Sequence, residues 1–214
     1  PIITNILQPF QNKKEQEFYN TIEFNSLAEF QSITNSNTLS HHAKLAKYLE
    51  IILRLRQATI HPQLVINGFA KKGIHASKWH TLFSTKFNIL KKQFLLLKKT
   101  APKDNIIVFT HFKLEVAILQ RILQKLQLSF LTLDGDTSHH IKSQIASSTL
   151  IPKVLIINIK SGSTGLNLQH YNRIFFLAPD WNPANTLQAI ARAHRIGQHK
   201  QVYITTLSIQ NTID

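Results

Sequence analysis

One amide and two guanidinium side chains recur at helical spacing near the end of the chain. Gln188, Arg192 and Arg195 stand four and then three residues apart, so a helix would bring them to one face. Guanidinium groups donate paired hydrogen bonds to phosphate oxygens, and a rigid cation stabilises the charge that develops during phosphoryl transfer. The spacing therefore predicts a phosphate-binding helix face. For two arginines alone, the simpler alternative is an ordinary solvated surface.

The flanking residues set the expected limits of this helix. Asn182 is a favourable N-cap, and Pro183 suits the first helical position because its missing N–H would have no partner there. Gly197 is a suitable left-handed stop, so we predict a helix over residues 183–196 with both arginines near its C-terminal end. An apolar stripe on its other faces is expected to dock onto a core, formed by Leu187, Ile190, Ala191 and His194.

Two uncommon strings precede the helix. Residues 161–167 read Ser-Gly-Ser-Thr-Gly-Leu-Asn, and the two glycines allow backbone amides to approach an anion closely, although such a turn is weak evidence alone. Trp181 stands just before Asn182 and Pro183, where it either stacks on a base or packs in a core. Further upstream, Thr110 ends an expected strand, where its hydroxyl suits a phosphate oxygen or a plain helix cap.

In this order, the strings resemble the last motifs of the Swi/Snf family of DNA translocases, within helicase superfamily two. The resemblance is carried by Gly-Leu-Asn-Leu at 165–168, Trp-Asn-Pro at 181–183 and Gln-Ala-Ile-Ala-Arg-Ala-His-Arg-Ile-Gly-Gln at 188–198. Ser-Thr-Lys at 84–86 and Ile-Ile-Val-Phe-Thr-His-Phe at 106–112 are similar to earlier motifs of that family. The similarity extends over nearly the whole chain from about residue 53 onward, and the final helix is its most specific part.

The resemblance implies a nucleotide site shared with another lobe. In the family, the arginines that correspond to Arg192 and Arg195 reach across a cleft to ATP, and Gln188 would help to orient that contact. We therefore expect Arg192, Arg195 and Gln188 to be the catalytic residues. Gly165 and Asn167 complete the expected nucleotide-binding set. The same resemblance implies contacts with double-stranded DNA.

We expect the DNA to be bound by Thr110, Ser161, Thr164 and Trp181. The resemblance further implies nucleosomes or other DNA-bound proteins as partners. It implies a nuclear location, or a cytoplasmic one if the source is viral or bacterial.

The chain lacks two strings that ATP hydrolysis requires. It has no Gly-x-x-x-x-Gly-Lys-Ser/Thr loop for the phosphates and no acidic strand end for magnesium. In the family these belong to an N-terminal lobe, which would hold most of the ATP and magnesium. Since Pro1 is not an initiator, we expect the chain to be an excised half of an ATPase, inactive alone. The alternatives are a strand-separating helicase lobe and a non-hydrolysing basic DNA-binding module.

Composition agrees with a nucleic-acid partner. The formal net charge is +14 over 214 residues, and such a field favours polyanions. No apolar run approaches the ~20 residues of a membrane-spanning helix, so we expect no membrane partner. The chain has no cysteine, and its 11 histidines lack carboxylate companions at ligand spacing, so we expect no metal site.

The pattern of apolar residues divides the chain in two. Residues 1–83 are expected to form a mainly helical segment between lobes, with helices over about 11–30 and 43–60. Residues 84–214 alternate between helical periodicity and short apolar runs at 106–109, 130–133, 154–159, 174–177 and 202–207. This alternation predicts an α/β fold, a parallel sheet with helices on both faces, which is the RecA-like architecture of the family. Residues that directly follow the strands should line one edge of the sheet.

Overall fold

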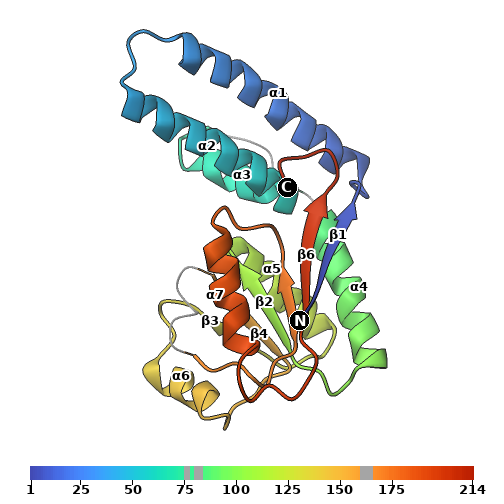
Figure 1. Cartoon of the computed structure of the whole chain (residues 1–214). Helices are drawn as coiled ribbons and strands as arrows, with labels where there is room; N and C mark the ends of the chain where they lie inside the picture. Colours follow the sequence, from blue (N-terminus) through green and yellow to red (C-terminus); the bar gives the residue numbers. More distant parts are fainter. Residues whose placement is uncertain (75–77, 80–83, 160–165) are drawn as a thin grey trace. The chain divides into compact units, whose positions relative to one another are not determined.

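The computed structural model describes residues 1–74, 78–79, 84–159 and 166–214 (Figure 1). The chain divides into two compact units, which are described separately. The sheet unit comprises residues 1–6 and 89–207, and the helical unit comprises residues 7–88 and 208–214.

The sheet unit is built on parallel strands, as predicted. The six-stranded sheet has the order β1-β6-β5-β2-β4-β3, and its strands are β1 (Ile2–Gln8), β2 (Ile106–Thr110), β3 (Phe130–Leu133), β4 (Val154–Asn158), β5 (Arg173–Phe176) and β6 (Tyr203–Ile209). Residues 106, 154, 173 and 203 lie in register across four strands, so these strands begin at one edge and end at the other. The apolar strands β2 and β4 are buried on both faces, as is usual for a parallel sheet.

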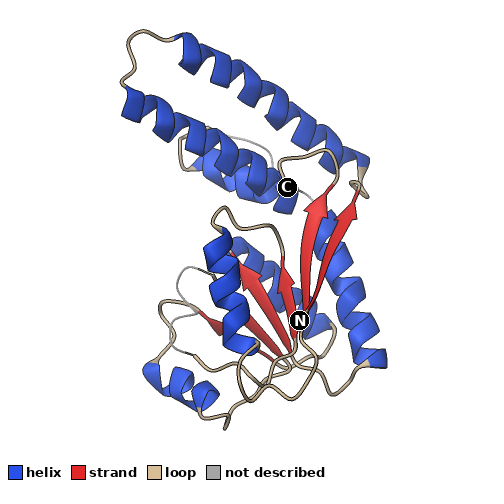
Figure 2. Ribbon diagram, in the orientation of Figure 1, coloured by secondary structure: helices blue, strands red, loops and turns tan. Residues whose placement is uncertain are grey.

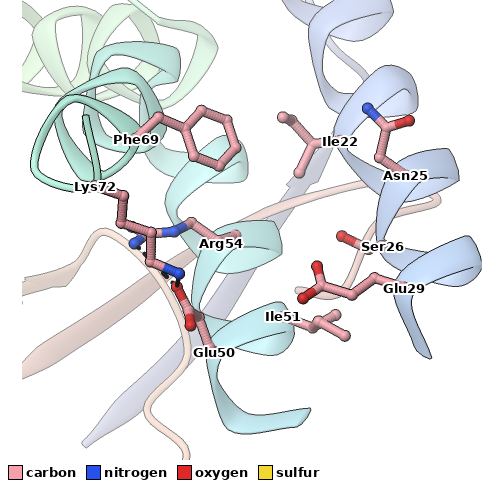
Figure 3. A pocket seen from close by; sticks show the side chains of 9 residues that line it. All are labelled: Ile22, Asn25, Ser26, Glu29, Glu50, Ile51, Arg54, Phe69 and Lys72. Atoms are coloured by element: carbon pink, nitrogen blue, oxygen red, sulfur yellow. Dashed lines mark hydrogen bonds and ion pairs between the residues drawn. The ribbon is translucent and has the colours of Figure 1, made fainter. Parts of the chain in front are cut away.

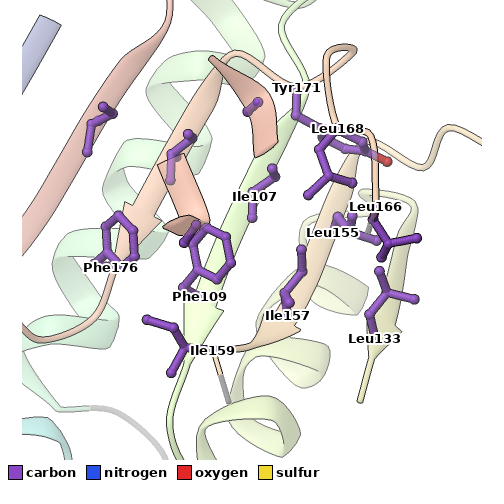
Figure 4. Packing of buried hydrophobic residues seen from close by; sticks show 14 of the residues in the cluster. Ile107, Phe109, Leu133, Leu155, Ile157, Ile159, Leu166, Leu168, Tyr171 and Phe176 are labelled. Atoms are coloured by element: carbon purple, nitrogen blue, oxygen red, sulfur yellow. The ribbon is translucent and has the colours of Figure 1, made fainter. Parts of the chain in front are cut away.

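Helices cover both faces of the sheet (Figure 2). One face carries α6 (His139–Ala146) and α7 (Pro183–Ala193), and the other carries α4 (Thr85–Thr100) and α5 (Lys113–Lys125). On the first face, Phe109 and Phe176 stack with ring centroids 5.0 Å apart, within the buried cluster drawn in Figure 4. On the second face, Phe94 of α4 meets Phe175 edge-on at 6.0 Å. The predicted α/β fold is therefore confirmed.

The helical unit contains α1 (Lys13–Asn35), α2 (His41–Ile60) and α3 (Pro62–Ala70). Asn12 and Ser40 cap α1 and α2, since their side chains accept hydrogen bonds from the backbone N–H groups of Lys14 and Ala43. The His61 ring accepts a hydrogen bond from the N–H of Gln63 at 3.1 Å and so caps α3. Both helices predicted before residue 60 are present and are longer than expected. None of the helices in the described ranges is long and apolar enough to span a membrane.

A cavity of about 120 Å³ opens between these three helices (Figure 3). Its lining includes Ile22 from α1 and Phe69 from α3. Its polar groups neutralise one another, because the Glu50 carboxylate is paired with Lys72 and lies 3.4 Å from Arg54. The hydrogen bond from Lys72, with the nearby Arg54 charge, lowers the pKa of Glu50 despite its partial burial. We assign no ligand to this cavity.

The two compact units differ from the division expected between residues 83 and 84 at both ends of the chain. Residues 1–6 belong to the sheet unit, because the N–H of Ile2 donates to the carbonyl of Val202 at 2.8 Å and β1 thereby extends the sheet beside β6. Residues 208–214 belong to the helical unit, where the N–H of Ile213 donates to the Tyr19 hydroxyl at 3.0 Å. These hydrogen bonds join positions that are remote in the sequence, so no local sequence pattern predicts them.

A buried ion pair fixes the end of the chain inside the helical unit. Lys86 Nζ lies 2.5 Å from Asp214 Oδ2, and the two side chains are 0% and 1% exposed. The other carboxylate oxygen of Asp214 accepts a hydrogen bond from the Thr59 hydroxyl at 3.0 Å. The N–H of Ile209 donates to Asp214 Oδ2 at 3.1 Å. Each charge is therefore compensated in a place that water does not reach.

We expect Asp214→Asn to destabilise the fold strongly. The amide still offers an acceptor to Thr59, but the buried Lys86 ammonium loses its counter-charge, which typically costs about 3–5 kcal/mol. Urea unfolding measures the change. The matched control is Glu17→Gln in the exposed pair of Lys13 and Glu17, 3.7 Å apart, where about 1 kcal/mol or less is expected. Equal effects of the two substitutions would contradict a special role for the buried pair.

Candidate functional site

The carboxyl ends of the parallel strands form the edge that the sequence predicted. Thr110 pairs with Asn158 at the ends of β2 and β4, and Phe109 pairs with Phe176 near the ends of β2 and β5. The segments that follow β2, β3, β4 and β5 therefore leave the sheet on the same side. This edge gathers two of the residues expected to contact DNA, Thr110 and Trp181.

Thr110 lies deeper than expected. Its side chain is fully buried, and its hydroxyl donates a hydrogen bond to the carbonyl of Ile157 at 3.3 Å. In this arrangement the neighbouring strand β4 provides the acceptor for the Thr110 hydroxyl. The contact of Thr110 with a DNA phosphate stays a prediction.

Trp181 is an exposed residue. It is 46% accessible, which excludes the alternative that it belongs to the core. It stands between Asp180 and the N-cap residue Asn182, at the start of α7. An exposed aromatic ring at this edge retains the ability to stack on a base, and this role also stays a prediction.

Asp180 organises the start of α7, although the sequence reasoning gave it no role. Its Oδ1 accepts hydrogen bonds from the N–H of Asn182 at 2.9 Å and from the Asn185 side chain at 3.0 Å. Its Oδ2 lies 3.1 Å from Nε2 of His111, which directly follows β2. Burial raises the pKa of Asp180, but these hydrogen bonds and the His111 ring outweigh it, so the pKa is lower than usual. Asp180 thus connects the segments that follow two neighbouring strands.

The helix itself ends earlier than predicted. α7 comprises Pro183–Ala193, so it stops before Arg195 and not at residue 196. Asn182 caps the helix as predicted, and Gly197 has the expected left-handed conformation with φ 95°. The early end has a tertiary cause: Nε2 of Gln198 donates to the carbonyls of Gln169 at 2.7 Å and of Ala193 at 3.2 Å. Gln198 was part of the quoted motif, but its role was missed.

The helix also buries a different face from the predicted one. The buried residues of α7 are Ala189 and Ala193, while Ile190 packs partly against the same core. Leu187, which was expected to dock, is 66% exposed. The small alanine side chains let the helix backbone approach the sheet closely, and this favours their face over the bulkier one.

The C-terminal end of α7 forms a second group of predicted residues. The N–H of Leu168 donates to the carbonyl of Arg192 at 3.0 Å, and the Gln169 side chain donates to the carbonyl of Ile196 at 2.6 Å. Asn167, Arg192 and Arg195 are thereby held in neighbouring segments. At 1.5 Å per residue, the helix separates this group from Trp181 by roughly 16 Å. Ser161, Thr164 and Gly165 lie outside the described residues.

The catalytic candidates are available to a ligand. Gln188 and Arg195 are exposed and Arg192 is half-buried. Among the described residues, no hydrogen bond or ion pair engages the side chains of these three residues. Two guanidinium groups without counter-charges are suited to phosphate oxygens. In the part of the chain that the structure describes, no three His, Asp or Glu side chains gather closely enough to hold a metal ion.

Comparison with known proteins gives the family. The sequence model of the helicase conserved C-terminal domain matches residues 85–197, which is more than half of the chain. The chain belongs to this helicase C-terminal domain family. The matched range covers β2–β5 and α4–α7 and includes Arg192 and Arg195.

Curated relatives identify the type of this helicase domain. It is 36% identical to the ATP-dependent helicase fft1 of Schizosaccharomyces pombe over 58% of this chain and 14% of that protein. It is 29% identical to the ISWI chromatin-remodeling complex ATPase ISW2 of Saccharomyces cerevisiae over 78% of this chain and 15% of that protein. The chain therefore spans about a seventh of the length of these relatives. The resemblance to Swi/Snf-type helicases is confirmed.

The helicase domain also matches a solved structure. The crystal structure of the C-terminal part of the Fun30 ATPase domain aligns with a TM-score of 0.72 over 99% of this chain and 87% of that chain. The sequence identity is 23%, so this likeness supports the fold alone. It extends over both the helical unit and the sheet unit.

We expect Asp180→Ala to destabilise the helicase domain by about 1 kcal/mol or more, because the N–H of Asn182, the Asn185 amide and the His111 ring lose their common partner at the start of α7. The folded pKa of Asp180 lies below its ordinary value of 3.8, so its stabilisation is present above about pH 4 and is lost as the pH falls through the folded pKa. Urea unfolding of the parent and variant should show their difference shrinking below about pH 4. Asp136→Ala, at an exposed aspartate, is the matched control.

Proposed function

We propose that the chain is the C-terminal motor lobe of an ATP-dependent double-stranded DNA translocase of the Swi/Snf type. The observation that carries the proposal is the pair Arg192 and Arg195, which lie in the family-matched range without counter-charges among the described residues. Swi/Snf-type relatives named as ATP-dependent helicases support the assignment to a nucleotide-driven motor. Arg192 and Arg195 would act as arginine fingers toward a nucleotide held mainly by an N-terminal lobe.

The residues at the end of α7 fit a nucleotide phosphate. Two free guanidinium groups and the exposed Gln188 amide offer several donors and no negative charge. The planar donors of arginine stabilise charge that develops on phosphate oxygens, and this is the chemistry required of the catalytic group. Gln188 would orient the contact, and Asn167 and Gly165 would complete the nucleotide-binding set. Magnesium and most of the ATP would be held by the N-terminal lobe, since this chain has no phosphate loop.

DNA would lie along the carboxyl ends of the strands. The exposed Trp181 ring supports this proposal, together with the net charge of +14. Thr110, Ser161 and Thr164 remain the proposed contacts with the DNA backbone. The partners would be double-stranded DNA, the N-terminal lobe and DNA-bound proteins such as nucleosomes, and the location would be the nucleus. The relative named as a chromatin-remodeling ATPase supports the choice of nucleosomes.

In the protein with both lobes, Arg195→Ala should lower DNA-stimulated ATP hydrolysis by on the order of 10³-fold or more, by analogy with other arginine fingers. DNA affinity should change little, because one positive charge among many is lost. Arg195→Lys should also lower the rate of ATP hydrolysis, because the point charge of an ammonium does not reproduce the planar donors of a guanidinium. Arg192→Ala should behave like Arg195→Ala. ATPase rate and DNA affinity are measured for each variant.

Arg121→Ala is the matched control for this series, because Arg121 is an exposed arginine in the middle of α5. It should keep the full ATPase rate. If Arg195→Ala also kept it, or lost DNA binding and ATPase activity in equal measure, the arginine-finger role would have to be abandoned.

The 214-residue chain by itself should not hydrolyse ATP above background, with or without DNA. The reason is that the arginines supply charge to a phosphate that the chain has no loop to hold. A phosphate-release assay on the purified chain tests this, with the two-lobed protein as the positive control. Steady turnover by the isolated chain would show that the site is not a half-site.

A further inference from the structure

Charge is unevenly distributed between the two edges of the sheet. The acidic residues of the sheet unit other than Asp104 are Glu115, Asp134, Asp136 and Asp180, and all follow the carboxyl ends of strands. Basic residues gather instead where strands begin. This amino edge carries Lys98, Lys99, Lys103, Lys125, Lys153, Arg173 and Lys200, at the ends of α4 and α5 or at the starts of strands. We call this set the basic edge.

A hollow of about 300 Å³ lies within the basic edge, where β2, β5 and β6 begin. In the described part of the chain, Asp104 is the one acidic residue that lines it. Arg173 Nε lies 2.7 Å from Asp104 Oδ2, and Lys200 Nζ lies 3.5 Å from Oδ1. Lys103 also lines the hollow, and no hydrogen bond or ion pair engages its side chain among the described residues. The hollow lies at the opposite edge from Thr110 and Trp181, the two described residues among the predicted DNA contacts.

The hollow holds more positive charge than it can neutralise. Lys103, Arg173 and Lys200 line the hollow, and Lys153 lies beside it. Together they contribute four positive charges, against the single negative charge of Asp104. Burial lowers the pKa of Lys153, and repulsion by Lys200 lowers it further, against the attraction of Asp104. Like charges at such short range destabilise one another unless an anion lies among them.

The cations are held in place by the fold. Lys200 Nζ donates to the carbonyl of Lys103 at 2.6 Å, and Lys153 Nζ donates to the carbonyl of Pro102 at 2.6 Å. The Arg173 guanidinium lies over the Tyr203 ring at 3.7 Å. Buried Asn172 connects the loops, since its Oδ1 accepts from the N–H of Asn105 at 3.3 Å. This ordering lowers the entropic cost of binding an anion here.

We propose that the basic edge is a second binding surface for DNA, which holds backbone phosphates in and beside the hollow around Asp104. The proposal concerns sequence-independent contact, because lysines in a shallow hollow neutralise phosphates without reading base edges. It does not depend on the arginine-finger assignment. A motor lobe with this surface would hold one DNA segment at the carboxyl ends of its strands and a second segment at the amino ends.

The shape of the basic edge favours DNA over a small anion or an acidic protein segment. Its cations are spread from β3 to β6, a width of four strand spacings, or roughly 19 Å. A single phosphate group would occupy only part of that row, whereas a nucleic-acid backbone presents charges along all of it. Binding of a protein segment usually requires an apolar anchor in a pocket. The one aromatic ring in the hollow, Tyr203, is covered by Arg173.

The test is a charge reversal of the two exposed lysines that line the hollow, Lys103→Glu with Lys200→Glu, in the 214-residue chain. The unchanged chain should bridge a donor-labelled and an acceptor-labelled duplex, seen as energy transfer between them. The variant should lose this bridging. The salt dependence of its DNA affinity should also weaken, by about 1.8 in the log–log slope, if two phosphate contacts are lost. Lys103→Glu alone should lower the slope by about half as much. This substitution removes no side-chain hydrogen bond or ion pair among the described residues.

The matched control reverses two exposed charges in the middle of helices, Lys92→Glu with Arg121→Glu, and should retain bridging. Equal losses in both pairs would mean general electrostatics and would overturn the proposal. The proposal would also be overturned if the unchanged chain bridged no duplexes, or if the Lys103→Glu, Lys200→Glu variant retained full bridging. Displacement by inorganic phosphate at low concentration would indicate a small-anion site. Stronger competition by polyglutamate than by DNA would indicate an acidic protein. Each outcome is independent of the ATPase rates that test the proposed function.

Discussion

The in-register pairing of parallel strands is the constraint on which every proposed site depends. Residues 106, 154, 173 and 203 lie side by side at one edge, and their strands end together at the other. β2 and β4 are apolar and buried on both faces, so a slip in register would require the close-packed side chains on both faces of the sheet to repack. All loops that leave strands therefore meet at one edge, and all loops that enter strands meet at the other.

A helix between parallel strands must return across the sheet, and this gives α7 two different ends. Its start lies near the carboxyl ends of the strands, where Asp180 joins it to His111 after β2. Its end lies near the segment that enters β5, where Gln198 and Leu168 hold it. The exposed tryptophan belongs to the first end and the arginines belong to the second. Close packing by Ala189 and Ala193 fixes the helix on the sheet between these two points.

The sequence predicted the features that local chemistry determines. Short apolar runs predicted strands β2 to β6 but not β1, and Asn182 with Pro183 predicted the start of α7. The sequence did not predict the features that depend on partners distant along the chain. The end of α7 depends on Gln198 contacts with residues before β5, and Asp180 pairs with His111, 69 positions away. Thr59 and Asp214, which are 155 positions apart, meet in the helical unit. The burial of Thr110 likewise follows from the neighbouring strand and not from its own segment.

The acidic residues show why the excess of positive charge calls for an external partner. Glu15 accepts hydrogen bonds from Thr85, Asp180 caps α7, and Asp214 neutralises Lys86. Each of these carboxylates is committed to the fold and is not available to balance surface cations. At the amino edge, Asp104 is likewise committed to the fold, because it pairs most closely with Arg173. Its single negative charge leaves the positive charge of Lys103, Lys153 and Lys200 largely uncompensated. Self-repulsion of a +14 chain disfavours the compact state, and a bound polyanion removes that repulsion while it releases counterions. The same electrostatics thus links the stability of this domain to the binding of a polyanion such as the proposed DNA partner.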